Sequence, residues 1–316
     1  LTFDKIYKNC KVFKLEQNYR STKNILDTAS SLISNNVDRV GKKLWSSGDK
    51  GETVKLNCYQ TGKEEAEGIS DIIENIIKKK FSLNQTTILV RAIYQTREFE
   101  ERFLKVGIGY RVLGGTKFYE RAEIKDAVSY LRIINQKYDD LALERVIGVP
   151  KRGVGETTIN QIYTFGSKNK ICLEDSIYKM LEKNMFKPKI KKSLSNLIRM
   201  IKKWREDFKK NKHYDLLKLV LDESGYSEIL KNKKDLDNEN RLENIKELLR
   251  AMRDYDNLQS FLEHVALATS IDKEWEGEKI NLMTMHAAKG LEFDVVFLPG
   301  WEEGLFPHQK SLDEKG

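Results

Sequence analysis

The spacing of apolar residues divides the chain into segments of two kinds. Up to residue 118, short runs rich in β-branched residues alternate with amphipathic helical patterns. Helices are predicted at residues 21–34, with Ser21 or Thr22 as the N-cap, and at residues 64–79. Strands that alternate with long helices favour a parallel α/β sheet. The predicted strands are residues 12–15, 53–59, 87–90 and 110–113.

Between residues 121 and 269 the strand pattern is absent, and apolar residues recur at helical spacing. Strand patterns return at residues 280–285 and 294–299, and the second run is apolar enough for a strand covered on both faces. A sheet pattern that stops for about 150 residues and then resumes indicates a helical domain inserted into an α/β domain. Breaks between its helices are predicted at Pro150, Gly166, Pro188 and Gly225.

Composition narrows the class of protein. Apolar residues make up 40% of the chain and charged residues 33%, as in globular proteins. No apolar run approaches the ~20 residues that span a bilayer, so we expect no membrane partner. The three cysteines lie far apart, which favours reduced thiols in a cytoplasmic protein. The spacing of Cys10, Cys58 and Cys172 matches no metal or redox motif, and we predict no metal site. The net charge of +8 suits an anionic partner, most commonly nucleic acid.

The first stretch with candidate chemistry is residues 15–22 (LEQNYRST), at a predicted strand end that leads into a helix. Ligands of open α/β sheets bind at the carboxyl ends of strands. Tyr19 can stack on a base there, and the Arg20 guanidinium can stabilise charge on a transferring phosphoryl group. A core tyrosine beside a surface arginine explains these residues equally well.

The second stretch, residues 286–293 (HAAKGLEF), lies between two predicted strands. Its small residues and Gly290 let the backbone approach a ligand closely. His286 and Lys289 can donate to phosphates, and Glu292 can accept from a ribose hydroxyl. An ordinary turn with solvated charges is the alternative.

Two features of the helical block suit phosphate binding. The turn Gly153-Val154-Gly155 exposes successive backbone N–H groups, which favour an approaching phosphate. Residues 179–212 carry 13 Lys and Arg against 3 Asp and Glu. They form either a duplex-binding face or a solvated helix face whose other side is buried. A plain helix–helix connection is the alternative for the turn.

Several long motifs occur in an order that resembles superfamily 1 DNA helicases of the UvrD/PcrA/Rep type. Residues 15–22 resemble motif IV, and residues 280–314 resemble motif V with its downstream extension. Residues 109–134 (GYRVLGGTKFYERAEIKDAVSYLRII) resemble the passage from the second motor domain into its insertion. Residues 150–158 (PKRGVGETT) resemble a glycine-rich turn of that insertion. The resemblance is weakest from about residue 172 to 236.

The resemblance implies a RecA-like parallel sheet, the P-loop NTPase-like second motor domain, interrupted by an all-α inserted subdomain. The implied domains are residues 1–118 and 272–316 for the motor domain and 119–271 for the insertion. The insertion is expected to swing as a body on its two connections, near Phe118 and Ile271.

The resemblance also implies roles for single residues. Tyr19 would stack on adenine, Arg20 would reach the γ-phosphate, and Glu292, beside Gly290, would contact the ribose. Arg91 would contact single-stranded DNA, although Ile93 stands where the family commonly has asparagine. The remaining implied DNA contacts are His286, Lys289, His308, Gly153, Val154 and Gly155.

The phosphate-binding half of an ATPase is not apparent. No segment reads G-x-x-x-x-G-K-[ST], and the nearest, residues 109–117, is interpreted as a turn. ATP and Mg²⁺ are the implied cofactors, with the Mg²⁺ ligands in an absent first motor domain of the same parent chain. The chain begins at Leu1, not at methionine, so we expect a piece of a longer protein that is inactive alone.

The implied partners are single-stranded DNA, a duplex junction and DNA-repair proteins, and the implied polarity is 3′ to 5′. Two alternatives remain open. One is a helicase–nuclease subunit of the RecB/AddA kind, and the other is a non-catalytic DNA-binding module.

Overall fold

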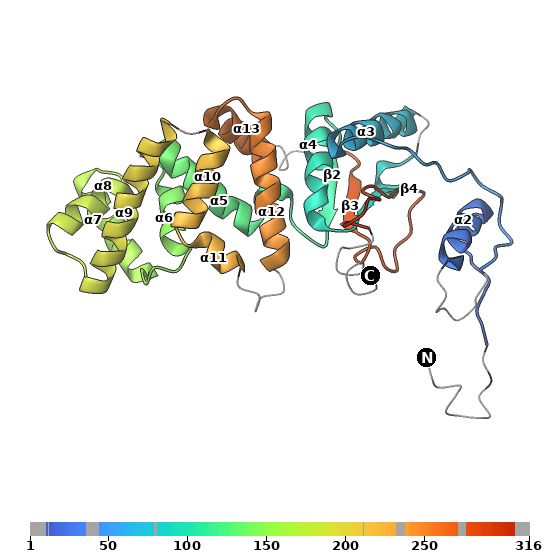
Figure 1. The fold of residues 1–316 in the computed structure, drawn as a ribbon, viewed down its shortest axis with the longest axis horizontal. Coiled ribbons are helices and arrows are strands. Elements are labelled where there is room, and N and C mark those ends of the chain that lie inside the picture. The colour runs from blue at the N-terminus through green and yellow to red at the C-terminus, as the bar shows by residue number, and fades with distance from the viewer. Residues whose placement is uncertain are drawn as a thin grey trace. The chain divides into compact units, whose positions relative to one another are not determined.

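The computed structural model describes residues 11, 13–35, 44–78, 81–210, 212–231, 238–270 and 276–306 (Figure 1). The chain forms two compact units, residues 1–60 and residues 61–316. Each unit is described below by itself.

In the first unit, helix α2 (Lys23–Ser34) confirms the helix predicted from residue 21. Thr22 occupies the N-cap position, but its side chain accepts no capping hydrogen bond. Instead, the backbone N–H groups of Lys23 and Asn24 donate to the carbonyls of Asp49 (3.2 Å) and Lys50 (3.1 Å). A neighbouring backbone segment therefore satisfies the N–H groups that a helix start leaves open.

The prediction of a strand at residues 53–59 is wrong, and Phe13 to Leu15 belong to no strand either. The described part of this unit contains a single parallel β-bridge, between Gln17 and Trp45. Leu56 is 89% exposed, so the β-branched pattern finds no covering layer within the unit. A strand is stabilised by its neighbours more than by its own propensity.

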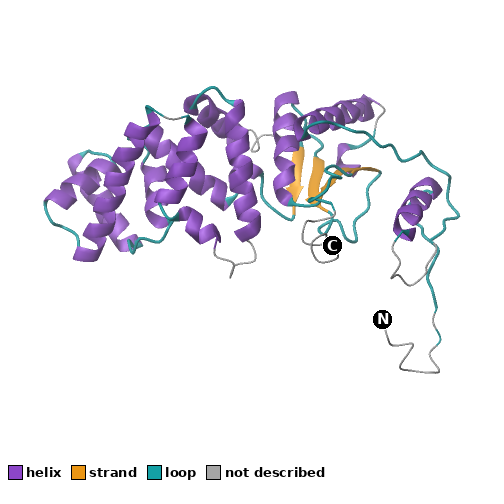
Figure 2. Cartoon of the chain, viewed as in Figure 1, coloured by secondary structure: helices purple, strands orange, loops and turns teal. Residues whose placement is uncertain are grey.

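The second unit contains a parallel four-stranded sheet in the order β2-β3-β1-β4 (Figure 2). Residues distant in sequence are paired, with Thr87 opposite Asn281 and Tyr110 opposite Ile280. Helices α3 and α4 pack against the sheet in one core that includes Ile73, Phe103 and Ile88. The strands are β1 (Thr86–Val90), β2 (Tyr110–Leu113), β3 (Ile280–Thr284) and β4 (Val295–Phe297), and the two helices are α3 (Gly62–Lys78) and α4 (Thr96–Val106).

The four strands match four sequence predictions, but β4 is shorter than its apolar run. Neither face of β4 is fully buried, and Val296 is 46% exposed. The expectation of a strand covered on both faces is wrong because β4 is the last strand in the order, at an edge of the sheet.

The described residues between 122 and 270 are helical wherever they form regular structure, as predicted. Their core includes Trp204, which is fully buried and donates from Nε1 to Glu223 Oε2 (2.8 Å). The helices are α5 (Ala122–Asn135), α6 (Asp140–Gly148), α7 (Glu156–Asn169), α8 (Leu173–Glu182), α9 (Pro188–Phe208), α10 (His213–Glu223), α11 (Tyr226–Lys231), α12 (Asn238–Ala251) and α13 (Leu258–Ser270). Short 3₁₀ turns lie at Leu83–Gln85, Ile93–Gln95, Phe118–Glu120 and Met252–Asp254.

Three of the four predicted breaks separate helices, but Gly166 lies inside α7. A Cβ at Gly166 would lie 2.7 Å from Ser176 Oγ and 2.9 Å from the Ile171 carbonyl oxygen. The glycine therefore permits close helix packing and does not end the helix.

Two separate apolar cores lie in the second unit, one under the sheet and one among the helices from residue 118 to 268. The domain boundaries near residues 118 and 271 stay a prediction. Among the residues that the structure describes, no helix is both long and apolar enough to cross a membrane.

Candidate nucleotide and DNA interface

Tyr19 and Arg20 lie on an exposed turn of the first unit, just before α2. The side chain of Asn18 forms this turn, because its Oδ1 accepts from the backbone N–H groups of Arg20 and Ser21, both at 2.9 Å. The Tyr19 side chain is 83% exposed, and Arg20 is exposed as well. The alternative of a core tyrosine is therefore wrong for the structure of this unit.

Gly51 supports the start of α2, directly after this turn. Its carbonyl accepts from Asn24 Nδ2 (2.8 Å), and its φ of +70° lies in the left-handed region. A Cβ at this position would lie 2.5 Å from Thr22 Cβ. Both the conformation and the space at this site therefore require glycine.

In the second unit, the motif V stretch leaves the sheet directly after β3 as a series of turns. The Ala287 N–H donates to Thr284 Oγ1 (3.2 Å), and the Ala288 N–H donates to the Thr284 carbonyl (3.1 Å). Thr284 thus anchors the turn to the end of the strand. The predicted contact residues His286, Lys289, Gly290 and Glu292 are all exposed.

The loop after β1 carries Arg91, which is half-buried, and Ile93. The Ala92 N–H donates to Gln95 Oε1 (2.8 Å), which closes a short 3₁₀ turn after the loop. A Cβ at Gly115 would meet the Ile93 side chain at 3.6 Å. Ile93 therefore packs against the loop after β2, and its aliphatic side chain can form no hydrogen bond.

The loops after β1, β2 and β3 meet at the carboxyl edge of the sheet. Gly114, with φ +77°, follows β2, and a Cβ there would lie 3.3 Å from Ala287 Cβ in the loop after β3. The interpretation of residues 109–117 as a turn is right only for the part after β2, since residues 110–113 are the strand itself. Parallel strands bring their carboxyl ends to one edge, where α/β sheets bind ligands.

Gly300, beyond β4, is held by Glu65 of α3. Its N–H donates to Glu65 Oε1 (3.1 Å), and burial raises the pKa of this carboxyl. The hydrogen bond from Gly300 acts in the opposite direction on that pKa but is the smaller effect.

The glycine turn of the helical part is exposed at Gly153 and Gly155, while Val154 packs against the helical core. Gly153 has φ +74°, and Gly155 is the N-cap of α7. Sequence reasoning did not identify Arg152, which holds the turn in place. Arg152 donates to the Pro150 carbonyl (2.9 Å), to the Tyr130 hydroxyl (2.9 Å) and to the Val146 carbonyl.

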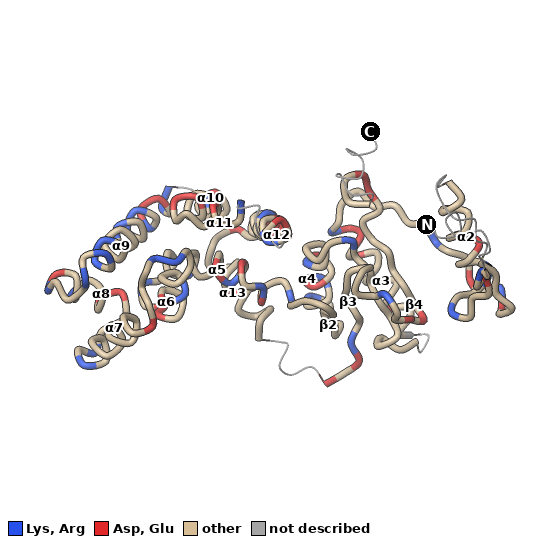
Figure 3. Tube along the Cα trace, turned by 90° about the horizontal axis from the view of Figure 1, so that it is seen from below, with Lys and Arg blue, Asp and Glu red and all other residues tan. Residues whose placement is uncertain are grey.

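Lys189 of α9 also belongs beside this turn, since a Cβ at Gly153 would lie 3.9 Å from Lys189 Cε. Along α9, Lys and Arg recur through the length of the helix, as the blue segments in Figure 3 show. The inner face buries the predicted residues Leu194, Leu197, Ile198, Ile201 and Trp204. The exposed basic residues of α9 are Lys189, Lys192, Arg199, Lys202 and Lys203.

The predicted site residues thus fall into three places. Tyr19 and Arg20 belong to the first unit, the carboxyl-edge residues to the sheet, and the glycine turn to the helical part. His308 lies outside the described residues. Among the described residues, no three His, Cys, Asp or Glu side chains are grouped to hold a metal ion.

Comparison with known proteins identifies a family for the chain. Residues 13–316 match the family model of the UvrD-like helicase C-terminal domain. The chain is 43% identical to a probable DNA helicase II homolog of Rickettsia felis, over 100% of the chain and 49% of that protein. It is 39% identical to the ATP-dependent DNA helicase PcrA of Bacillus subtilis, over 100% of the chain and 44% of that protein. The chain spans about half the length of the curated relatives it matches.

A family match over nearly the whole chain, a parallel sheet and a helical block between its second and third strands lead to one assignment. The chain belongs to the UvrD-like helicase C-terminal domain family.

Proposed function

We propose that this chain is the second motor domain, with its inserted helical subdomain, of an ATP-dependent DNA helicase. The parent protein would translocate 3′ to 5′ on single-stranded DNA and separate duplex DNA during repair or replication in the cytoplasm. The observation that carries the proposal is the exposed turn that presents Tyr19 and Arg20 at the family's motif IV.

The chain would supply one side of the ATP site. The exposed ring of Tyr19 is available to stack on adenine, and Arg20 is a candidate finger for the γ-phosphate. Glu292 would accept from the ribose, with Gly290 allowing close approach. When the two motor domains close on ATP, these residues would sense whether the γ-phosphate is present.

Mg²⁺ would be held by the first motor domain of the parent chain. Among the described residues no three His, Cys, Asp or Glu side chains are placed to hold a metal ion, so no Mg²⁺ ligand is proposed in this chain. Mg²⁺ would neutralise charge on the phosphates, while the residues of this chain orient the nucleotide.

The DNA contacts would lie at two places. Arg91, His286 and Lys289 line the carboxyl edge of the sheet and are proposed to hold the single strand, together with His308. Gly153, Val154 and Gly155 are proposed to contact the duplex through backbone N–H groups. Lys189 lies beside that turn and adds a positive charge for a phosphate.

The test is ATP hydrolysis in the presence of single-stranded DNA. The isolated chain should show no DNA-stimulated turnover, because it lacks the phosphate-binding half. In the parent protein, Arg20→Ala should lower kcat by about 10³-fold or more, the range for a finger arginine. Lys23→Ala is the matched control, since Lys23 is an exposed cation three residues away and should leave kcat within about twofold.

Two results would overturn the proposal. One is turnover by the isolated chain that Arg20→Ala abolishes, and the other is an unchanged kcat for the Arg20→Ala parent. The RecB/AddA alternative gains no support from the relatives described above, which are named DNA helicase II homolog and PcrA.

A further inference from the structure

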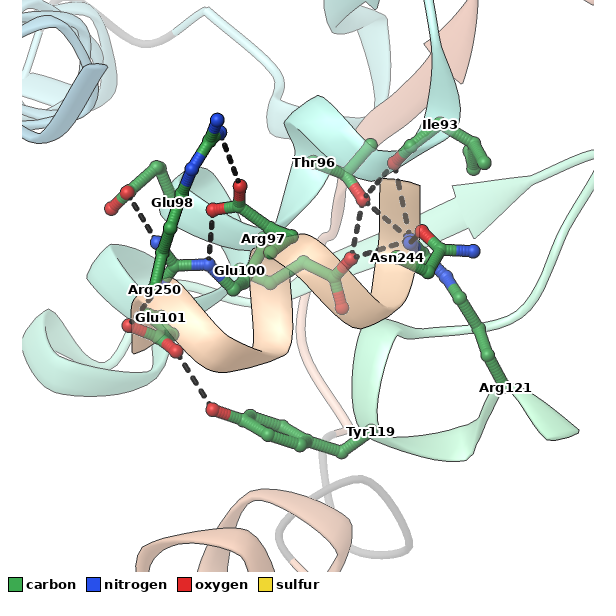
Figure 4. A network of polar contacts seen from close by, with 11 residues as sticks. Ile93, Thr96, Arg97, Glu98, Glu100, Glu101, Tyr119, Arg121, Asn244 and Arg250 are labelled. Carbon is green, nitrogen blue, oxygen red and sulfur yellow. Dashed lines mark hydrogen bonds and ion pairs between the residues drawn. The ribbon is translucent and has the colours of Figure 1, made fainter. Parts of the chain in front are cut away.

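A buried arginine joins the sheet to the helical part. Arg121, the N-cap residue of α5, is 6% exposed. Its Nη2 donates to the Ile93 carbonyl (3.2 Å) and to Thr96 Oγ1 (2.8 Å), and its Nη1 donates to Asn244 Oδ1 of α12 (2.6 Å) (Figure 4). Its Nε donates to the Thr116 carbonyl (3.3 Å). One guanidinium therefore contacts the loops after β1 and β2, helix α4 and helix α12.

Glu100 of α4 completes this cluster beside the guanidinium of Arg121. Its carboxylate accepts from Thr96 Oγ1 (2.6 Å) and from the Phe118 N–H (2.9 Å), and it lies 3.5 Å from Arg121 Nη2. Burial raises the pKa of Glu100, and the charge of Arg121 acts against that rise. The two hydrogen bonds that the Glu100 carboxylate accepts thus fix α4 and the start of the helical part.

The helical end of the cluster is equally well anchored. Asn244 Nδ2 donates to Glu123 Oε1 of α5 (2.5 Å), which orients the amide so that its oxygen faces Arg121. Ile245 and Leu248, on the same helix, are buried in the helical core. A displacement of Arg121 would therefore move α12, which is packed into the helical core.

The choice of arginine follows from geometry. A planar guanidinium carries five N–H donors in a fixed fork, whereas a lysine ammonium is a single point charge on a flexible stem. Four acceptors in different directions require the fork. Removing so buried a charge from water is costly, and apolar replacements of buried ion pairs are often no less stable. The pair of Arg121 and Glu100 therefore contributes geometry more than stability, although loss of Arg121 alone would leave the Glu100 charge buried and unpaired.

We propose that Arg121 is a positioning residue that holds the loop after β1, and with it Arg91, in register with helix α12 of the helical part. The proposal rests on the proposed function in one respect, the role of Arg91 in DNA binding. Under this proposal Arg121 transmits the position of the loop after β1 to the helical part, and it contacts neither nucleotide nor DNA.

The experiment is hydrogen exchange on the 316-residue chain, which needs no DNA. Arg121→Met should raise exchange about tenfold or more at two separate places, residues 92–96 and 244–248, because one side chain holds both. Arg121→Lys should restore protection at only one of them. Arg145→Met is the matched control, since Arg145 pairs with Asp126 (2.6 Å) within the helical part and should leave residues 92–96 unchanged.

The second readout is the affinity for a fluorescent oligothymidylate. If Arg121 positions Arg91, Arg91→Ala should weaken binding about tenfold in the wild type and less than about threefold in the Arg121→Met background. In the Arg145→Met background the tenfold loss should persist.

The outcomes separate the two proposals. A wild-type affinity that Arg91→Ala does not change would overturn the DNA role of Arg91, while the exchange data still decide on Arg121. Exchange that rises at only one of the two places, or at neither, would overturn the role of Arg121. Equal losses for Arg91→Ala in all three backgrounds would also overturn it.

Discussion

Arg97 of α4 forms a second polar layer between the sheet and the helical part, and its removal gives a sharp prediction. Its side chain is 3% exposed, and Nε lies 2.6 Å from Glu247 of α12. It also pairs with Glu101, at 2.9 Å from Nη1, and with Glu98 (Figure 4). Arg97→Met would keep much of the side-chain volume but leave three carboxylates without their shared cation.

The magnitude follows from burial. Breaking a buried ion pair by removing one partner costs about 3–5 kcal/mol. The side chains of Glu98 and Glu101 are 27% and 19% exposed, so both can turn towards water, which favours the lower end of the range. A loss of about 3 kcal/mol corresponds to roughly a hundredfold faster hydrogen exchange of the backbone amides of α12 that exchange when this contact opens.

The matched control is Arg250→Met, which removes an arginine from the same carboxylate. Arg250 is 66% exposed and lies 3.1 Å from Glu247 Oε2. An exposed pair contributes about 0–1 kcal/mol, so exchange in α12 should rise less than about tenfold. Comparable rates for the two variants would refute the reasoning.

The pH dependence supplies a second check. Burial raises the pKa of Glu98 above its ordinary value of 4.5, and the charge of Arg97 opposes that rise. Without Arg97 the folded-state pKa rises further. A carboxyl whose folded pKa lies above its unfolded value adds stability below the unfolded pKa and loses it as the pH rises through the folded one. The deficit of Arg97→Met should therefore be greatest at neutral pH and shrink on acidification, after correction for intrinsic exchange. A deficit that grows towards low pH would contradict this account.

Two further substitutions test other parts of the structure. Gly51→Ala should destabilise the start of α2, because the new Cβ would lie 2.5 Å from Thr22 and the left-handed backbone adds about 1–2 kcal/mol of strain. Gly107→Ala is the control, since Gly107 also has φ +70° but lies in open space and should show the strain alone. Local hydrogen exchange at each site measures both, and equal effects would exclude the proposed clash. Glu65→Gln should flatten the fall in thermal stability as the pH rises from about 4 to about 7, because burial raises the pKa of Glu65 and its ionised form is the disfavoured one. If the wild type instead gained thermal stability relative to Glu65→Gln as the pH rises, this account of Glu65 would be contradicted.

Sequence patterns predicted those elements in which the spacing of apolar residues matches the face that is buried in the structure. The spacing of Leu194, Leu197 and Ile201 describes a half-buried helix, and α9 has that burial. The strand predicted at residues 53–59 failed because alternation indicates a possible strand but not its partner. Gly166 resembles a helix end in sequence, whereas its role depends on Ser176 in the neighbouring helix.

Arg121 illustrates the other limit. In the sequence it is one basic residue among 56, and nothing local distinguishes it from a surface arginine. Its role depends on acceptors contributed by Ile93, Thr116 and Asn244, which only the tertiary structure brings together. The exposed turn at Tyr19 was anticipated as a motif, but the hydrogen bonds that Asn18 Oδ1 accepts to shape it were not.

The strand order has a consequence for how the chain folds. Strand β3 lies between β1 and β2, yet it is synthesised after the entire helical block, and Thr87 must find Asn281. Contacts so distant in sequence form slowly, since a long loop must close before they contribute. During synthesis the helices can pack while β1 and β2 still lack the strand that joins them. Their exposed edges then depend on the late arrival of β3, so that the sheet is the part of the molecule most vulnerable to misassembly on the ribosome.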